Sequence, residues 1–373
     1  MIHAIRPPRD GGNILVRDVA ANEARLSILP DWPGGWAQWF YFLVDAEPGT
    51  DCTFHLTNAG NCSYPEGWPG YRAWGLDGRE WRRVDTEYAA GILTIRHRMV
   101  GGEAAFAYFV PYSLDRHRTL VAKTATRFDV ERLGSSVEER PIERIQAGDG
   151  PAQIWIVGRQ HSGETMASWW MEGALERLVE TSELLQAATV NIVPLVNPDG
   201  AFRGHLRANA AGRDLNRQWL APDPTSEPEV ACILAAMDET GVDLLLDVHG
   251  DETIPHVFID GCETIPGVNG YQLDGLDVFA RLLRTHSPVF QTRIGYPSTY
   301  AGDAAQGMCA RAVAARFGAV GMTLEMPFSD ALEGPDPVYG WSPAQSMQLG
   351  QDCIDTLAAF MKSGCPRRST NSV

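Results

Sequence analysis

A histidine and a glutamate lie three residues apart in His161-Ser-Gly-Glu164, just after the apolar run IWIVG. Residues spaced by three at a helix start face the same side, so both side chains can reach one metal ion. A catalytic zinc site takes three protein ligands and leaves a position for water. His249, in the distant stretch DVHGDE, is the candidate for the third ligand. The sequence therefore predicts one Zn²⁺ per chain, held by His161, Glu164 and His249.

Polar side chains follow several apolar runs that have the length of strands. The four residues in question are His161, Asn197, His249 and Glu325. In open α/β sheets, ligands bind at the carboxyl ends of the strands, so we expect these four residues at one edge of a sheet. A ligating histidine is usually oriented by a carboxylate, and either Asp247 or Asp251 can fill that role.

The elements that must position these residues begin near residue 115. Two helical stretches, 165–180 and 227–241, alternate with short apolar runs at 151–158, 188–198, 242–250 and 321–328. This alternation predicts an α/β domain with a mixed, mostly parallel sheet flanked by helices. We assign it residues 115–373, with a disordered tail from about residue 363.

The first part of the chain has a different pattern. Short aromatic and β-branched runs are separated by turn-rich pieces, which predicts an antiparallel β-sandwich over residues 1–114. Such a domain either shapes the mouth of the cleft or only stabilises the protein.

Composition restricts the partners and the compartment. The chain has 373 residues, and 47 acidic against 31 basic residues give a net charge of −16. This acidic balance disfavours nucleic acid and anionic membranes as partners. We expect neither a targeting segment nor a membrane span, because no stretch has the roughly 18 apolar residues that a span needs. The seven cysteines are scattered without a CxxC pair, which predicts reduced thiols and a cytoplasmic location.

Several motifs together resemble the zinc carboxypeptidase superfamily, specifically its cytosolic carboxypeptidase branch, whose known members include deglutamylases. The matching pieces, in family order, are HSGE, NPDG, GRDLNRQW, DVHGDE and TLEMPF. The segments WAQWFYF, WRRV and FAYFVPYS are similar to the amino-terminal sandwich of that branch. The resemblance places the zinc ligands on His161, Glu164 and His249, in agreement with the spacing argument.

The resemblance also implies roles for five further residues. Glu325 matches the catalytic carboxylate, and Arg207 matches the arginine that polarises the scissile carbonyl. Asn216 and Arg217 match the pair that holds the terminal carboxylate of the substrate, for which a planar guanidinium is well suited. Arg311 occupies the place of an arginine that faces the side-chain pocket, although the segment after it is about one residue shorter here. If Arg311 lines that pocket, acidic terminal residues become the expected preference.

The resulting hypothesis is a metallocarboxypeptidase that cleaves the last peptide bond of peptides or protein tails. Either Tyr296 or Tyr300 is available to cover the bound terminus, and no motif decides between them. Two alternatives stay open from the sequence. One is a zinc amidohydrolase that acts on N-acyl amino acids or cell-wall peptides, and the other is a catalytically silent peptide-binding module. The oligomeric state has no signal in the sequence.

Overall fold

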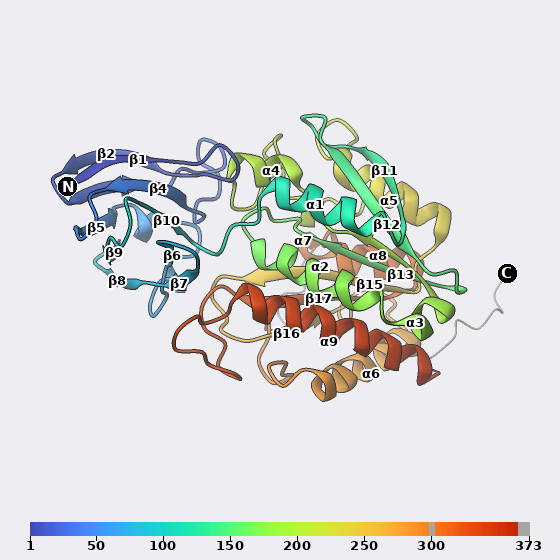
Figure 1. The fold of residues 1–373 in the computed structure, drawn as a ribbon. Helices are drawn as coiled ribbons and strands as arrows, with labels where there is room; N and C mark the ends of the chain where they lie inside the picture. The colour runs from blue at the N-terminus through green and yellow to red at the C-terminus, as the bar shows by residue number, and fades with distance from the viewer. Residues whose placement is uncertain (298–302, 365–373) are drawn as a thin grey trace.

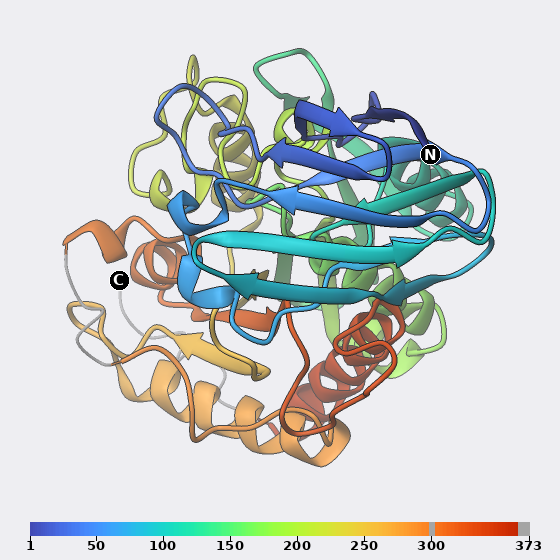
Figure 2. The ribbon, with the colours of Figure 1, turned by 90° about the vertical axis from the view of Figure 1, so that its left-hand side faces the viewer.

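The computed structural model describes residues 1–297 and 303–364. Tyr300 and all but the first residues of the predicted tail lie outside this part of the chain. Figure 1 shows a β-rich amino-terminal part beside a larger α/β part, and the rotated view in Figure 2 shows the amino-terminal strands in front of the α/β part.

Two five-stranded sheets form the amino-terminal part. The first sheet has the order β1 (Ile2–Arg6), β4 (Tyr41–Ala46), β10 (Glu103–Ala107), β6 (Trp74–Leu76) and β7 (Trp81–Arg83). The second has the order β2 (Leu15–Ala20), β3 (Glu23–Ser27), β5 (Asp51–Leu56), β9 (Ile92–Arg98) and β8 (Asp85–Ala89). Every pairing is antiparallel except that of β3 with β5. Alternate residues of β4 and β5 are buried, because side chains of a strand point alternately to its two faces.

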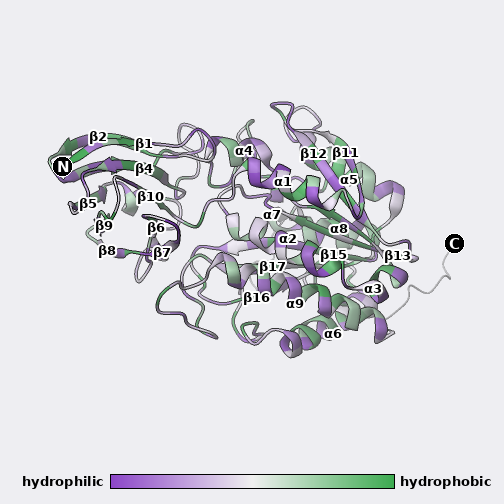
Figure 3. Cartoon of the chain, in the orientation of Figure 1, coloured by the Kyte–Doolittle hydropathy of each residue, from purple (hydrophilic) through white to green (hydrophobic). Residues whose placement is uncertain are grey.

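A seven-stranded mixed sheet forms the centre of the α/β part. Its order is β11 (Asp129–Ser135), β12 (Pro141–Ala147), β14 (Ala188–Val193), β13 (Ala152–Gly158), β15 (Leu244–Asp251), β17 (Val320–Pro327) and β16 (Phe258–Gly261). The four strands β14, β13, β15 and β17 run parallel, and each outer strand pairs antiparallel with its neighbour. Strands β14, β15 and β17 are buried along their whole length, since helices cover both faces. Figure 3 shows the hydrophobic colour along these central strands.

Alternate residues of the central strands pack against different sets of helices. Ile154 and Ile156 join a core that includes α2 (Thr165–Leu178), α6 (Gly270–His286) and α9 (Pro343–Lys362). Trp155 and Val157 join a second core with α5 (Pro228–Thr240) and α8 (Cys309–Phe317). The remaining helices are α1 (Leu114–Thr124), α3 (Ser182–Ala187), α4 (Pro198–Arg203) and α7 (Asp303–Gln306). The predicted fold, a sandwich followed by a mixed α/β sheet with flanking helices, is confirmed.

Helices α2 and α9 pack unusually closely, as glycine allows. A Cβ atom on Gly173 of α2 would lie 2.0 Å from the carbonyl oxygen of Met347. A Cβ atom on Gly350 of α9 would lie 2.2 Å from the carbonyl oxygen of Trp170. Because α2 begins directly after Glu164, this contact fixes the helix that carries part of the predicted metal site.

The sandwich and the α/β part share one hydrophobic core and a buried arginine. The Arg83 guanidinium donates hydrogen bonds to the carbonyl oxygens of Phe328 (2.7 Å), Tyr339 (2.9 Å) and Trp341 (3.1 Å). It also bonds to the carbonyl of Arg72 in its own domain. Phe328 directly follows Pro327, the last residue of β17, so Arg83 connects the sandwich to the end of a central strand.

Two further features concern the apolar length of the helices and the pairing of the cysteines. No helix within residues 1–297 and 303–364 is long and apolar enough to span a membrane. All six cysteines in those ranges are unpaired.

Candidate active site

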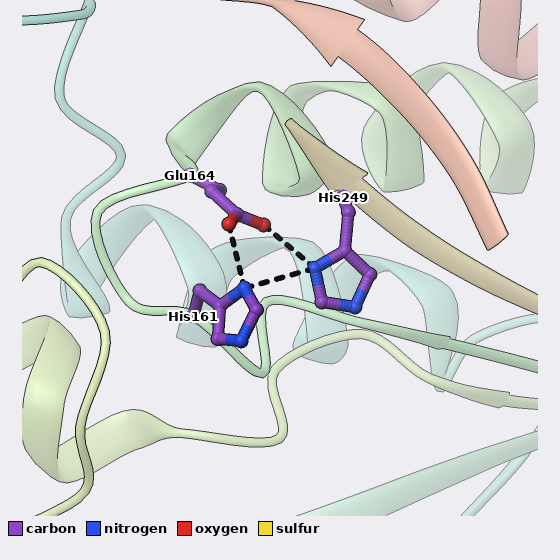
Figure 4. Close-up of side chains that lie close together, drawn as sticks. All are labelled: His161, Glu164 and His249. Atoms are coloured by element: carbon purple, nitrogen blue, oxygen red, sulfur yellow. Dashed lines mark hydrogen bonds and ion pairs between the residues drawn. The ribbon is translucent and has the colours of Figure 1, made fainter. Parts of the chain in front are cut away.

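His161, Glu164 and His249 converge at the carboxyl edge of the central sheet (Figure 4). Glu164 Oε1 lies 2.6 Å from His161 Nδ1, and Glu164 Oε2 lies 2.8 Å from His249 Nδ1. The two Nδ1 atoms are 3.1 Å apart. All three residues are buried, and their ligand atoms lie within 4.8 Å of one another.

Local structure accounts for the positions of these three side chains. Strand β13 ends at Gly158, and Arg159 then adopts a left-handed φ of 59°, which turns the chain towards His161. Glu164 stands at the N-cap position of α2 but makes no capping bond with its side chain, because its carboxylate faces the two histidines. Asn197 donates to the carbonyl of Gln160 and caps α4, so it supports this loop and is not a ligand.

Each histidine is also bound through its second ring nitrogen. His249 Nε2 lies 3.0 Å from Asp247, and His161 Nε2 lies 3.1 Å from Asp214. Such carboxylate partners orient a ligating imidazole and raise its basicity. Of the two sequence candidates, Asp247 contacts a histidine, whereas Asp251 instead accepts hydrogen bonds from Thr253 and Tyr296. The sequence analysis did not identify Asp214 as a partner of His161, although Asp214 lies in the motif GRDLNRQW two residues before Asn216.

The charged groups of this cluster shift one another's pKa values. Burial raises the pKa of the Glu164 carboxyl, but His161 and His249 outweigh this and bring it below its ordinary value. Burial lowers the pKa of His249, but Asp247 and Glu164 outweigh this and hold it well above the ordinary value. The pKa of Asp214 lies well below its ordinary value, since Arg207 and His161 overcome the effect of burial. The site therefore stabilises positive charge at its centre.

Glu325 lies beside this cluster because of strand register. It is paired with His249 across the parallel strands β15 and β17. Its Oε1 atom accepts a hydrogen bond from the Tyr296 hydroxyl at 3.0 Å, and its buried Oε2 has no hydrogen-bond partner among the described residues. Burial, together with Glu164 and Asp251, raises the pKa of the Glu325 carboxyl well above its ordinary value. A buried carboxylate with an unused oxygen suits a proton acceptor.

A cavity of about 220 Å³ opens over these groups. Arg207, Asn216 and Arg217 all line it together with His161, Glu164 and Glu325. Arg207 donates from Nε to Asp214 at 2.8 Å. Asn216 Nδ2 lies 3.3 Å from His249 Nε2, while its Oδ1 accepts from the backbone N–H of Cys309. The structure thus brings together seven of the eight residues singled out from the sequence. Six of them line the cavity, and the seventh, His249, contacts Glu164 and Asn216.

Arg311 is the eighth residue, and it is not among the residues that line the cavity. Its guanidinium forms an ion pair with Asp260 of β16 at 3.0 Å. Tyr296 contacts Glu325 and Asp251 through its hydroxyl, as described above, and Tyr300 falls outside the described residues.

Further residues complete the cavity wall. Tyr64 and Glu66 come from the sandwich, and Glu252 and Met308 from loops after β15 and before α8. Burial and the nearby Glu164 and Asp251 raise the pKa of Glu252 well above its ordinary value. No local motif marks Tyr64, because its contribution depends on how the two parts of the molecule dock.

The donor set fits a zinc ion on its own chemistry. Two imidazole nitrogens and one carboxylate form the ligand set of many catalytic zinc sites. Here these atoms face one another without an intervening side chain, and carboxylates bind both outer ring nitrogens.

Comparison with known proteins agrees with this geometry. The family model of the cytosolic carboxypeptidase N-terminal domain matches residues 5–109, and that of zinc carboxypeptidase matches residues 115–260. A metallo-carboxypeptidase from Pseudomonas aeruginosa, solved in complex with (2-guanidinoethylmercapto)succinic acid, is 42% identical with a TM-score of 0.92. The match covers 96% of this chain and 99% of that one. The chain belongs to the zinc carboxypeptidase family, in its cytosolic carboxypeptidase-like branch.

Other relatives of this metallocarboxypeptidase are similar over different lengths. A metallo-carboxypeptidase from Burkholderia cenocepacia is 34% identical with a TM-score of 0.92, over 96% of this chain and 99% of that one. An uncharacterized protein of Zymomonas mobilis is 44% identical over 94% of this chain and 95% of its own length. Cytosolic carboxypeptidase 6 of mouse is 31% identical over 42% of this chain, and the match spans 33% of the mouse protein.

Family membership confirms three predictions. The chain is an enzyme of the metallocarboxypeptidase class, its cofactor is zinc, and it acts on the carboxy termini of peptides or proteins.

Proposed function

We propose that this metallocarboxypeptidase binds zinc through His161, Glu164 and His249 and removes the last residue of peptides or protein tails. The observation that carries the proposal is the convergence of these three side chains next to Glu325, in one cavity with a guanidinium and an amide.

The substrate's terminal carboxylate is bound by Asn216 and Arg217. Support comes from their place in the cavity wall, next to the histidine cluster. A guanidinium binds a carboxylate with two parallel hydrogen bonds, and the amide of Asn216 adds a third donor. This recognition makes the enzyme an exopeptidase, because an internal peptide bond has no carboxylate at that distance.

Glu325 acts as general base and then as general acid. When bound, zinc lowers the pKa of water and polarises a carbonyl group. Glu325 accepts a proton from the attacking water and passes it to the leaving amine. Arg207 donates to the oxygen of the scissile carbonyl as negative charge develops there, a contribution worth about 3 kcal/mol. The free oxygen of Glu325 and its raised pKa support this assignment.

The function is tested with matched peptides that differ only at the carboxy terminus. The zinc-loaded enzyme is expected to release the last amino acid from a peptide with a free carboxylate and to leave the amidated peptide intact. Mass spectrometry of the products gives the readout. An N-acyl amino acid is included because it also ends in a free carboxylate. Turnover of that compound alone would indicate an amidohydrolase, and cleavage of the amidated peptide would contradict the carboxylate clamp.

The preference for acidic terminal residues depends on Arg311. Asp260 forms an ion pair with Arg311 and offsets part of its positive charge, so loss of the Asp260 charge should strengthen the preference for an acidic residue. We expect Arg311→Ala to lower kcat/KM on a glutamate-terminated peptide about 10-fold or more, and on a leucine-terminated peptide by less than twofold. Asp260→Asn is expected to shift the ratio towards glutamate. Equal losses on both peptides would contradict an acidic preference that depends on Arg311.

Two further proposals concern the whole chain. We propose that the boundary between the sandwich and the catalytic domain lies after residue 114, and the start of α1 at Leu114 supports this. A cytoplasmic location is supported by the unpaired thiols of the described cysteines.

A further inference from the structure

We propose that the sandwich domain completes the active site, with Asp31 and Tyr64 as positioning residues for Arg207. The inference rests on the proposed role of Arg207 in binding the developing oxyanion. It assigns the amino-terminal domain a part in the reaction itself.

Asp31 fixes the backbone of the loop that carries Arg207. Its carboxylate accepts three consecutive backbone N–H groups, from Leu206 (2.6 Å), Arg207 (2.8 Å) and Ala208 (2.8 Å). Asp31 is buried, and so are Leu206 and Ala208. A buried carboxylate that accepts three amide protons stabilises one loop conformation, since each unpaired group would be costly. These donors lie about 175 residues away in the sequence, in the other domain.

Tyr64 fixes the side chain of the same arginine. Arg207 Nη1 donates to the Tyr64 hydroxyl at 3.0 Å, while Nε donates to Asp214 at 2.8 Å. The ring of Trp36, also from the sandwich, lies 5.9 Å from the guanidinium carbon. Among the described residues, no hydrogen-bond acceptor contacts Nη2, so this nitrogen is available for a substrate oxygen. The guanidinium is therefore held in one orientation before substrate binds.

The sandwich also approaches the loop after His249. A Cβ atom on Gly67 would lie 2.3 Å from the carbonyl oxygen of Glu252, so the turn that follows Tyr64 packs directly on that loop. This contact fixes the position of Tyr64 relative to the histidine cluster. Preorganised donors stabilise a transition state because they need no reorganisation as charge develops.

The test is a double-mutant cycle in the zinc-loaded, full-length enzyme. Tyr64→Phe removes only the hydroxyl and is expected to lower kcat about 10-fold with KM changed less than twofold, as for a lost hydrogen bond to a charged group. In an Arg207→Ala background, Tyr64→Phe is expected to have no further effect on kcat. Tyr339→Phe is the matched control, because its hydroxyl bonds to Glu80 at 2.8 Å on the exposed side of the same domain junction. Its kcat should equal that of the wild type.

The possible outcomes separate this inference from the proposed function. If Arg207→Ala has normal kcat, the role of Arg207 is wrong. If Arg207→Ala is slow but Tyr64→Phe is normal, or if Tyr64→Phe costs the same in both backgrounds, the positioning role is wrong.

Asp31→Asn gives a second measurement that does not depend on turnover. It is expected to increase hydrogen exchange at the amides of residues 206–208 and to lower kcat more than it changes KM. Unchanged exchange at these amides would overturn the role of Asp31. If this variant does not fold, the Tyr64 cycle still tests the proposal.

Discussion

Glu164 connects the two histidines, which lower the pKa of its carboxyl, and it contributes in turn to the raised pKa of His249. It gives up the capping bond that an N-cap residue usually makes, and its carboxylate also accepts the N–H of Gly250 at 3.1 Å. The helix loses that stabilising bond, and the carboxylate is instead held between the two histidines that we propose as ligands. Glu325 is similar, because its unused oxygen is costly for stability but is available for the proton transfer that we propose.

Glu325→Gln tests that view of the catalytic carboxylate. The amide keeps the shape of the side chain but does not accept a proton, so kcat should fall about 1,000-fold while KM changes little. Zinc content, measured by metal analysis, should stay at the wild-type value. A variant that retains more than about a tenth of wild-type kcat would exclude Glu325 as the general base.

Glu229 at the start of α5 illustrates the cost of burying a carboxyl group. Burial raises its pKa from 4.5 to about 7, and its partner Asn209 donates to it at 3.2 Å. Between pH 4.5 and 7 the folded state binds more protons than the unfolded state, so the free energy of unfolding falls as pH rises, in total by about 3 kcal/mol.

Glu229→Gln should remove this decline. We expect the variant to be more stable than the wild type by about 2–3 kcal/mol at pH 8 and nearly equal at pH 4.5. Urea denaturation at the two pH values measures the difference. A wild-type protein whose stability rises between pH 5 and 8, relative to the variant, would contradict the raised pKa.

At the scale of elements, the sequence pattern predicted the site residues that lie at the ends of β-strands. The ligand spacing in HSGE and the apolar runs before His249 and Glu325 were sufficient, because parallel strands end at one edge of their sheet. Asp214 and Tyr64 were not predictable this way. They come from loops without periodicity, and their contacts depend on packing between segments far apart in the chain. The close packing of α2 on α9 was not predictable either, because it depends on how two helices far apart in the sequence lie against each other.

Gly350→Ala tests that helix contact. The added methyl would meet the carbonyl of Trp170, which is backbone and moves only with its helix, so we expect a loss of about 3 kcal/mol of stability. Because α2 carries Glu164, kcat should fall as well below the melting temperature. Gly270→Ala, at the first position of α6 where a Cβ atom meets nothing within 4 Å, is the control and should be neutral or stabilising. Equal melting temperatures of the two variants would refute the close-packing argument.

At the scale of the molecule, the two parts form one structure. The larger of the hydrophobic cores runs through both, Tyr108 stacks on Phe328 with centroids 4.4 Å apart, and Arg83 bonds across the junction. Burial lowers the pKa of Arg83 to about 10, and its hydrogen bonds to backbone carbonyls keep the guanidinium in place. We therefore expect the two parts to unfold together.

Arg83→Met should destabilise the whole protein by about 4 kcal/mol, because several buried carbonyls lose their donor. The neighbouring Arg82→Met is the control, since Arg82 is exposed and pairs with Glu80 on the surface, so its effect should stay within about 0.5 kcal/mol. Far-UV circular dichroism and tryptophan fluorescence should follow one coincident transition in the wild type. Two separated transitions would show that the sandwich folds independently.

The small volume of the catalytic cavity has a consequence for which proteins this enzyme can process. The space over the histidine cluster, about 220 Å³, is below the size of typical drug-binding pockets, so we expect it to take a single terminal residue. We therefore expect a target whose last residues are packed into its own fold to be spared, and one with a frayed end to be shortened stepwise. The rate of trimming should then depend on how often a chain end detaches, so the same protein is a good or a poor target according to its own local stability.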